Sequence, residues 1–351
     1  MSKKIFALLL ALCLCLMSVG LTGCGSQDEE SGVVNVYNWG EYIDEELLDQ
    51  FEAETGIKVN YDTFASNESL YSILSSGSAN YDVIIPSDYM ISRLISEDML
   101  EPLNFDNIPN YQYIDEAYKG LAYDSDQLYS VPYTWGTVGI IYNTTMLDYA
   151  PDSWSVLWDE DLRGQILMFN NSRDALGIAL KYCGYSMNTT NPEEITQATD
   201  LLIQQKPIVQ AYVMDQIFDK LEGGEAIVGP YYAGDAIVMM EENPDLAFAF
   251  PKEGTNLFVD AMCVPKGAGN KTNAEIFINW MCDPEHMAQN IEYIGYSSPS
   301  TAARELLPEE MRDDPICYPD QEILSKTETY YNLPQDTLDH YDSEWIRLMI
   351  S

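Results

Sequence analysis

Apolar residues along the first third of the chain alternate between the spacing of strands and the spacing of helices. Short apolar or alternating runs are typical of strands, and apolar side chains repeated every three or four positions are typical of helices. These two patterns follow one another at residues 33–37, 44–54, 57–61, 67–76, 83–85 and 89–100. A β-α-β-α-β order of this kind favours an open, mostly parallel sheet covered by helices.

A second series of elements begins near Thr137. Strands are predicted at residues 138–142, 166–169, 226–228 and 246–250. Helices are predicted at residues 153–158, 174–183, 192–205 and 234–242. The apolar run at 259–264 is expected to carry the chain back to the first series, where residues 274–287 predict another helix.

This order predicts an α/β protein with two lobes, each with a mixed sheet, that exchange strands through a hinge. We assign residues 33–136 plus 264–303 to an N-terminal lobe. Residues 137–263 plus 304–351 are assigned to a C-terminal lobe.

The amino terminus has the pattern of a secretion signal. Lys3 and Lys4 precede an apolar run at residues 5–20, and the box Leu21-Thr22-Gly23-Cys24 closes that run. We interpret residues 1–23 as a lipoprotein signal peptide, Cys24 as the lipid attachment site and residues 24–32 as a flexible tether. A transmembrane anchor is the alternative, but the apolar run is short for a span. The protein is therefore expected on the extracytoplasmic face of the cell membrane, held there by its lipid anchor.

The net charge of −40 argues against anionic binding partners. Nucleic acid and anionic lipid would be repelled by such an acidic chain. The negative charge is consistent with capture of a cation. It is equally consistent with a role in keeping the protein soluble, so the charge does not separate the two.

Cysteine and histidine offer little reactive chemistry. Cys183, Cys263, Cys282 and Cys317 are scattered without metal-ligand spacing, and we expect buried free thiols. Only two histidines occur, and neither lies near a nucleophile motif. No metal site, cofactor or enzymatic activity is expected.

Aromatic and acidic residues gather at the ends of the predicted elements. The candidate carboxylates are Glu41, Asp174, Asp235 and Asp260, and the candidate aromatic walls are Trp39, Tyr89, Tyr232, Phe258 and Tyr296. This mixture suits a polyamine, because its ammonium groups need carboxylates at intervals and its methylene chains need flat apolar walls. Taken singly, most of these residues have an ordinary structural role, since Glu41 and Asp174 fall where helix dipoles favour acids. Asp260 differs, because a carboxylate inside an apolar run needs a partner.

The same segments resemble the polyamine-binding proteins of ABC importers, the spermidine/putrescine type. The likeness is carried by the segments Tyr37-Asn38-Trp39-Gly40-Glu41-Tyr42, Val131-Pro132-Tyr133-Thr134-Trp135-Gly136 and Phe258-Val259-Asp260, among others. It implies a two-lobe periplasmic-binding-protein-like fold (type II) and a monomer that delivers spermidine or putrescine to an ABC permease with a cytoplasmic ATPase. The ligand-binding residues that it implies are Trp39, Gly40, Glu41, Tyr42, Ser87, Tyr89, Asn171, Asp174, Tyr232, Asp235, Phe258, Asp260 and Tyr296.

The chain departs from this family at several of those positions. Asn171 stands where similar spermidine binders tend to carry an acid, and Tyr232 replaces a frequent tryptophan. Asp235 is acidic, as in putrescine-preferring relatives, and Tyr330 aligns only loosely with a tail position that touches ligand in some members. These departures leave the length of the polyamine open.

Three other functions are alternatives to polyamine binding. A ferric-ion carrier of the same fold could use Tyr231 and Tyr232 as paired oxygen ligands. A secreted hydrolase could use two carboxylates such as Glu41 and Asp260. A sugar-binding protein would also carry aromatic residues, but would place more amide and guanidinium groups around them.

Overall fold

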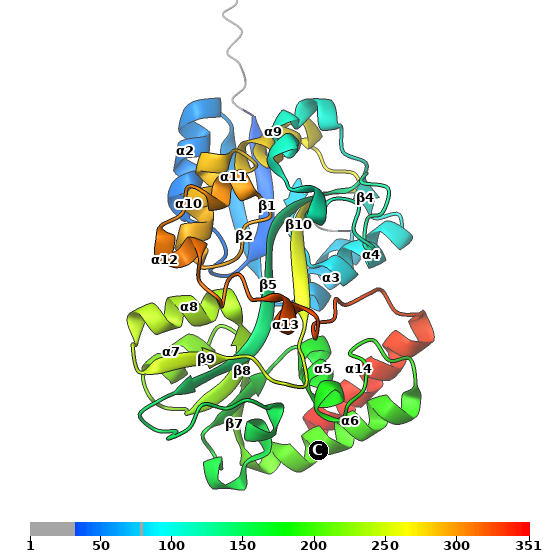
Figure 1. Ribbon diagram of the computed structural model, residues 1–351. Helices are drawn as coiled ribbons and strands as arrows, with labels where there is room; N and C mark the ends of the chain where they lie inside the picture. Colours follow the sequence, from blue (N-terminus) through cyan, green and yellow to red (C-terminus); the bar gives the residue numbers. More distant parts are fainter. Residues whose placement is uncertain (1–31, 78–79) are drawn as a thin grey trace, which may run out of the picture. The chain divides into compact units, whose positions relative to one another are not determined.

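The computed structural model describes residues 32–77 and 80–351. The predicted signal peptide, Cys24 and all but the last residue of the tether lie outside these residues. Residues 33–351 form one unit, which has two lobes (Figure 1).

Three parallel strands form the sheet of the N-terminal lobe. β1 (Val33–Trp39) lies between β2 (Lys58–Phe64) and β3 (Val83–Ile84). Side chains alternate across this sheet: Val34 and Val36 of β1 pack in one buried cluster, and Tyr37 packs in another. Helices cover each face, so β1 and β3 are largely buried, whereas the edge strand β2 is mostly exposed or half-buried.

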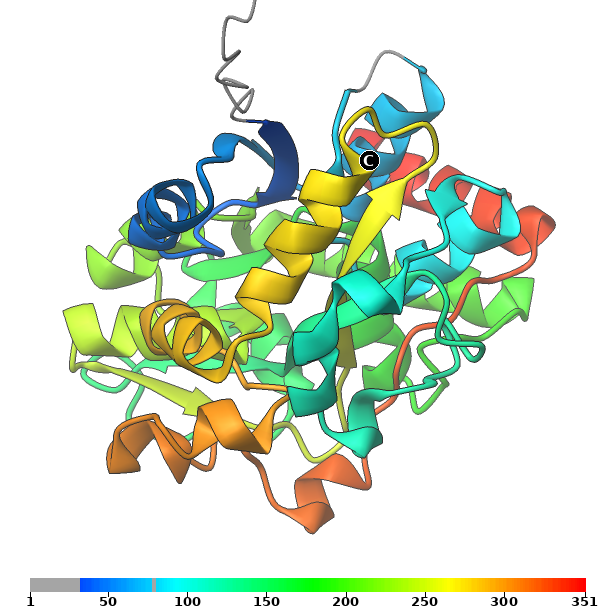
Figure 2. The same ribbon diagram turned by 90° about the horizontal axis from the view of Figure 1, so that it is seen from above.

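Helices from distant parts of the sequence supply those two layers. α2 (Glu45–Thr55), α9 (Lys271–Met281) and α10 (Pro284–Ile294) pack on the first cluster, and α3 (Asn67–Ser75) and α4 (Asp88–Ser96) pack on the second. Figure 2 looks down on this lobe and shows α2 and α9 beside the start of β1. A left-handed glycine ends α2 at Gly56, as the sequence predicts.

Two long antiparallel strands run from one lobe into the other (Figure 1). They are β5 (Ser130–Asn143) and β10 (Leu257–Pro265), which pair with each other. The sequence predicts only the second half of β5, because Pro132 and Gly136 interrupt the apolar pattern in its first half. The register of the pair shifts at Asp260/Ala261, an irregularity that lies in the middle of the crossing.

The C-terminal lobe continues the sheet from β5. The full strand order is β2-β1-β3-β10-β5-β8-β6-β7, with β4 (Leu100–Glu101) on β10 and β9 (Leu246–Ala249) on β5. β6 (Ile166–Phe169), β7 (Val209–Val213) and β8 (Val228–Tyr232) are mutually parallel. The sheet is therefore mixed, parallel inside each lobe and antiparallel along the crossing strands, as predicted.

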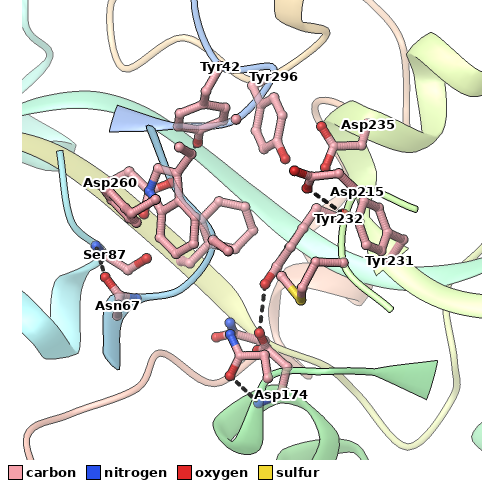
Figure 3. Close-up of a pocket in the computed structure, with 18 of the residues that line it drawn as sticks. Tyr42, Asn67, Ser87, Asp174, Asp215, Tyr231, Tyr232, Asp235, Asp260 and Tyr296 are labelled. Carbon is pink, nitrogen blue, oxygen red and sulfur yellow. Dashed lines mark hydrogen bonds between the residues drawn. The ribbon is translucent and has the colours of Figure 1, made fainter. Parts of the chain in front are cut away.

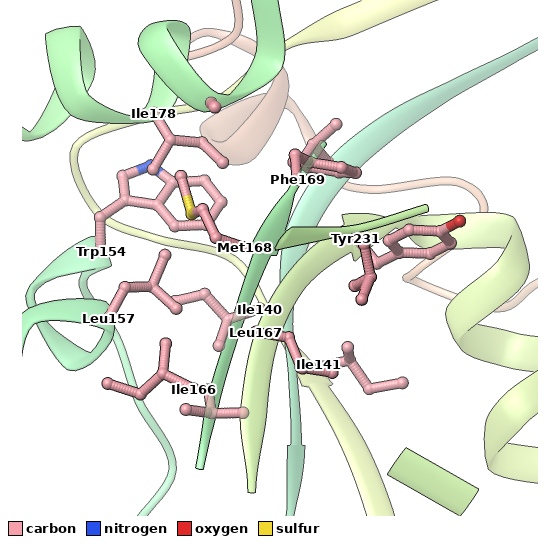
Figure 4. Close-up of a cluster of buried hydrophobic side chains, with 14 of the residues drawn as sticks. Ile140, Ile141, Trp154, Leu157, Ile166, Leu167, Met168, Phe169, Ile178 and Tyr231 are labelled. Carbon is pink, nitrogen blue, oxygen red and sulfur yellow. The ribbon is translucent and has the colours of Figure 1, made fainter. Parts of the chain in front are cut away.

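The core of this lobe lies between the sheet and its helices (Figure 4). Trp154 of the 3₁₀ helix η4 (Trp154–Trp158) is fully buried there against residues of β6 and of α5 (Ser172–Tyr182). The other helices of the lobe are α6 (Pro192–Gln205), α7 (Ile217–Glu222), α8 (Ala233–Glu242) and α14 (Gln335–Ile350). This lobe also has short 3₁₀ helices at Glu160–Leu162 and Lys206–Ile208. In the N-terminal lobe, 3₁₀ helices occur at Phe105–Asn107, Pro109–Tyr113 and Glu116–Tyr118.

The tail reaches the C-terminal lobe later than expected. α11 (Thr301–Arg304) and α12 (Glu309–Arg312) come first, and Leu307 and Met311 pack in the core of the N-terminal lobe. α13 (Gln321–Leu324) follows. Glu328 then forms an ion pair with Lys181 of α5, and α14 packs against α5 and α6.

Several expected boundaries differ in the structure. The helix expected at 274–287 is two helices, because Pro284 starts α10 after a turn at Cys282 and Asp283. The helix expected at 89–100 ends at Ser96, and Leu100 belongs to β4. Ser66 rather than Asn67 caps α3, and β7 and α7 were not foreseen.

The cysteines are free, but they are not all buried. Cys263, Cys282 and Cys317 are buried, whereas Cys183 is exposed at the end of α5, which corrects the expectation. Among the described residues, no helix combines the length and the apolar character needed to cross a membrane.

Candidate functional site

A pocket between the two lobes holds most of the predicted site. It contains about 660 Å³ of empty space, part of which is open to solvent. Twelve of the thirteen predicted binding residues line it: Trp39, Gly40, Tyr42, Ser87, Tyr89, Asn171, Asp174, Tyr232, Asp235, Phe258, Asp260 and Tyr296. Figure 3 labels ten of the lining residues, which come from both lobes and from β10.

The topology explains why residues far apart in the sequence meet here. Trp39 ends β1, Ser87 precedes α4 just after β3, and Tyr232 ends β8. The carboxyl ends of parallel strands face the ligand in open α/β sheets. The two lobes turn these ends toward each other, while β10 passes between them and supplies Phe258 and Asp260.

Asp260 is the carboxylate with the most constrained surroundings. It is 4% exposed, and its Oδ2 accepts a hydrogen bond of 2.6 Å from the Tyr42 hydroxyl. Its other oxygen, Oδ1, is buried without a hydrogen-bond partner among the described residues. Burial raises the pKa of Asp260 to about 6, although the Tyr42 and Ser87 hydroxyls act to lower it. A buried carboxylate oxygen without a partner is ready to accept a hydrogen bond from a cation.

Asp174 is a second buried carboxylate, in the first turn of α5. Its Oδ2 accepts a 2.7 Å hydrogen bond from the Tyr232 hydroxyl (Figure 3). Burial raises the pKa of Asp174 to about 6; the Tyr232 hydrogen bond opposes this rise and the Glu68 carboxylate adds to it. Arg173 is the neighbouring cation, and it acts to lower that pKa.

Asp235 and Asp215 form a third acidic position. Asp235 lies in the first turn of α8, and Asp215 lies in the loop between β7 and α7. Burial raises the pKa of Asp235 well above its ordinary value; a hydrogen bond from Tyr296 lowers it, and the Asp215 carboxylate raises it further. Figure 3 shows the two carboxyl groups beside each other, away from Asp174 and Asp260.

Aromatic rings form the walls between these carboxylates. Trp39 packs on Phe64 with ring centroids 4.6 Å apart, and Tyr296 meets Tyr42 edge to face at 4.7 Å. Across the pocket, Tyr232 meets Phe258 edge to face at 5.5 Å. Such rings cover methylene groups and attract cations over their faces.

Two predicted residues have other positions or roles. Glu41 is exposed and does not line the pocket, because the turn after β1 takes a left-handed backbone there, with φ at 48°. Asn171 lines the pocket but also caps α5, where its Oδ1 accepts a 3.0 Å hydrogen bond from the Arg173 amide. The presence of an asparagine at position 171 is therefore explained in part by its role as the N-cap of α5.

The predicted polyamine site did not include several other residues of the pocket: Phe64, Ala65, Asn67, Asp88, Met214, Asp215, Tyr231 and Asn256. Asp88 is fully buried, and burial raises its pKa well above the ordinary value. Tyr330, whose alignment was loose, lines the pocket and donates a 2.9 Å hydrogen bond to the Arg173 carbonyl. A signal for Asp215 existed, since a carboxylate two residues after a parallel strand falls at the ligand edge, but β7 itself was not recognised.

The pair Tyr231 and Tyr232 does not form a joint oxygen site. Tyr232 donates to Asp174, whereas Tyr231 donates to Asp215 at 3.4 Å. Burial raises the pKa of both phenols well above the ordinary value. Within residues 32–77 and 80–351, no cluster of three or more His, Cys, Asp or Glu is placed to hold a metal ion.

Comparisons with known proteins agree with this architecture. A protein from Salmonella typhimurium named spermidine/putrescine-binding periplasmic protein is 33% identical over 314 residues, which cover 89% of this chain and 90% of that one. A proposed spermidine/putrescine ABC transporter from Listeria monocytogenes has a solved structure that superposes with a TM-score of 0.88 at 41% identity, covering 91% of this chain and 99% of that one.

A third relative is the TpPotD lipoprotein of Treponema pallidum. Its structure gives a TM-score of 0.81 at 28% identity, and the match covers 90% of this chain and 99% of that one. The family model described as bacterial extracellular solute-binding protein matches residues 46–319. With the two lobes and the pocket between them, these matches show that the chain belongs to the bacterial extracellular solute-binding proteins.

Proposed function

We propose that this protein binds a polyamine, spermidine or putrescine, in the pocket between its lobes and delivers it to an ABC importer. The observation that carries the proposal is the placement of carboxylates at three separate positions in one aromatic-walled pocket: Asp174, Asp260 and the Asp215–Asp235 pair. A polyamine presents ammonium groups at intervals along an apolar chain, and this pocket offers the complement. The names of the relatives support the same ligand class.

The energetics of the pocket favour a cation. Burial raises the pKa of Asp174 and of Asp260 to about 6, so their charged forms are costly while the pocket holds no cation. An ammonium group that pairs with each carboxylate removes much of that cost, because it supplies a charge-assisted hydrogen bond at short range. Aromatic faces contribute roughly 0.5–2 kcal/mol each toward a cation.

Transport follows from capture and closure, without a catalytic step. Ligand that touches residues of both lobes stabilises the arrangement in which the lobes meet, and β5 and β10 are the segments about which they would separate. The closed monomer would then dock on permease subunits driven by a cytoplasmic ATPase.

The anchor belongs to the same proposal. Residues 1–23 would be removed and Cys24 acylated, so that the tether at 24–32 holds the protein on the outer face of the cytoplasmic membrane. The sequence pattern of the signal supports this, as does the description of the Treponema pallidum relative as a lipoprotein.

The alternatives fit the pocket less well. A ferric ion would need ionised phenols that converge, but the hydroxyls of Tyr231 and Tyr232 donate to separate carboxylates. A hydrolase built on Glu41 and Asp260 would need both side chains in the pocket, and Glu41 does not line it.

Titration calorimetry separates these functions. The protein is titrated in turn with spermidine, putrescine, ferric ion and an oligosaccharide. We expect saturable one-to-one binding of at least one polyamine and no binding of the other two ligands. Binding of ferric ion or of the sugar, with no heat from either polyamine, would reject the proposal.

A further inference from the structure

One carboxylate of the pocket, Asp215, meets a residue of the opposite lobe. Asp215 follows β7 in the C-terminal lobe, and Gly40 follows β1 in the N-terminal lobe. A Cβ atom built on Gly40 would lie 2.9 Å from Oδ2 of Asp215. Since atoms at that separation must shift, the absence of a side chain at position 40 gives the Asp215 carboxylate its room.

The neighbours of Asp215 leave its charge available to a ligand. Its Oδ1 accepts a long hydrogen bond of 3.4 Å from Tyr231, and no ion pair joins it to a cation of the described chain. Asp235 lies beside it with a second carboxyl group (Figure 3). Two adjacent carboxyl groups repel when both are charged, and a cation placed between them relieves that repulsion.

The chemistry of a primary ammonium fits this pair. Such a group carries three N–H donors, as the ammonium of lysine does, and one carboxylate satisfies only part of that capacity. The Tyr296 hydroxyl stands at the same place, where it acts on Asp235. At the other two acidic positions, the carboxylates of Asp174 and Asp260 each accept a hydrogen bond from a tyrosine.

We propose that Asp215 is a further ligand-binding residue that, together with Asp235, holds a terminal primary ammonium of the ligand, in the space that Gly40 leaves open. The proposal rests on the polyamine-binding function proposed above and assigns a further residue to it. In this assignment Asp215 binds one end of the ligand, a primary ammonium group that spermidine and putrescine share. The assignment also makes Gly40 a partner from the opposite lobe.

Calorimetry with spermidine and with putrescine tests this on the full chain. Asp215→Ala should raise the Kd about five- to tenfold for both ligands by a similar factor. Asp219→Ala is the matched control: its carboxylate is exposed, as that of Asp215 is, but it lies on the adjacent helix α7 and does not line the pocket, so either Kd should change less than twofold. Asp215→Asn repeats the test with a side chain of nearly the same shape, and the melting temperature without ligand shows that each variant is folded.

A double-mutant cycle tests the role of Gly40. Gly40→Ala should raise the Kd several-fold, because its methyl displaces the Asp215 carboxylate. In the Asp215→Ala background the same change should cost almost nothing.

These experiments distinguish rejection of the role of Asp215 from rejection of the proposed function. If Asp215→Ala and Asp215→Asn bind within twofold of the parent protein, or if Gly40→Ala costs the same in both backgrounds, the role of Asp215 is rejected. That result leaves the proposed function intact as long as the parent protein binds a polyamine. Failure of the parent protein to bind either polyamine would reject the function itself.

Discussion

Asp260 combines burial, a short hydrogen bond and one unpartnered oxygen on the strand that passes between the lobes. We expect Asp260→Asn to weaken polyamine binding by about 2–5 kcal/mol, because an ammonium group would lose its charged partner in a buried site. Trp39→Ala should cost more than about 1 kcal/mol through lost cation–π and methylene contact. Calorimetry gives both values, and Asp49→Asn, which removes an exposed carboxylate of α2, is the control. If Asp260→Asn and Trp39→Ala both bind like the parent protein, the pocket is not the binding site.

The same variant reports on ligand length. A middle ammonium needs a carboxylate midway along the pocket, and Asp260 is our candidate for it. Asp260→Asn should then penalise spermidine more than putrescine, which has no middle charge to leave unpaired. Competition titrations measure the ratio, and an equal loss for both ligands would assign Asp260 to a terminal ammonium instead.

The raised pKa values of Asp174 and Asp260 predict a pH dependence. Both carboxyl groups have a pKa near 6 in the folded protein and an ordinary value of 3.8, so the folded state holds protons between about pH 4 and 6 that the unfolded state releases. The stability of the ligand-free protein should therefore fall as pH rises through that window. Binding of a cation needs the ionised forms and should weaken as pH falls below about 6, by up to tenfold per pH unit for each carboxylate that must ionise.

Calorimetry from pH 5 to 8 checks this dependence. Repeating the titration near pH 6 in buffers with different ionisation enthalpies should reveal protons released on binding. A Kd that does not change over this range would show that these carboxylates do not meet the ligand.

Among the elements, α8 of the C-terminal lobe and the segment after α10 of the N-terminal lobe are in contact beside the pocket. A Cβ atom on Gly234 would lie 2.3 Å from Cδ2 of Tyr296, in the ring that walls the pocket. Gly234→Ala should therefore weaken binding more than tenfold by holding the lobes apart. The melting temperature without ligand should change by less than about 2 °C, since alanine favours the helix and separated lobes remove the clash.

Calorimetry and thermal unfolding together check the role of this contact. Gly269→Ala is the control, because its new methyl would meet nothing within 4 Å. Normal affinity in Gly234→Ala would mean that the lobes do not need this contact to hold ligand.

Helices and strands were predictable from the sequence where neighbouring residues mark their ends and one apolar face. α6 begins at Pro192 and ends at Gln205 as expected, because asparagine and proline mark its start and its apolar face is regular. β7 was missed because three of its five residues are only partly buried and one is exposed, which blurs the pattern. Missing β7 also hid Asp215, so one undetected strand removed a carboxylate from the predicted site.

Residue roles that depend on the backbone turn could not be predicted. Glu41 carries the family motif in sequence, yet the left-handed turn at that residue directs it away from the pocket lining. The hydrogen bonds from Tyr42 to Asp260 and from Tyr232 to Asp174 join positions 218 and 58 residues apart, and only the fold sets such pairs.

For the whole molecule, the proposed lipid anchor would decide where capture occurs. Cys24→Ser should abolish acylation and leave an unprocessed or freely secreted protein, because the thiol proposed to accept the lipid is lost. Mass spectrometry of the protein from its native host should find a diacylated amino terminus at Cys24. An unlipidated mature terminus at another residue would contradict the assignment.

The most direct test of the central claim is the crystal structure of the protein grown with spermidine. Our account predicts the ligand between the two lobes, with ammonium groups about 2.7–3.2 Å from oxygens of Asp174, Asp260 and the Asp215–Asp235 pair. Its methylene groups should lie against Trp39 and the other aromatic walls. A pocket that stays empty at saturating spermidine, or spermidine bound elsewhere on the protein, would contradict the account.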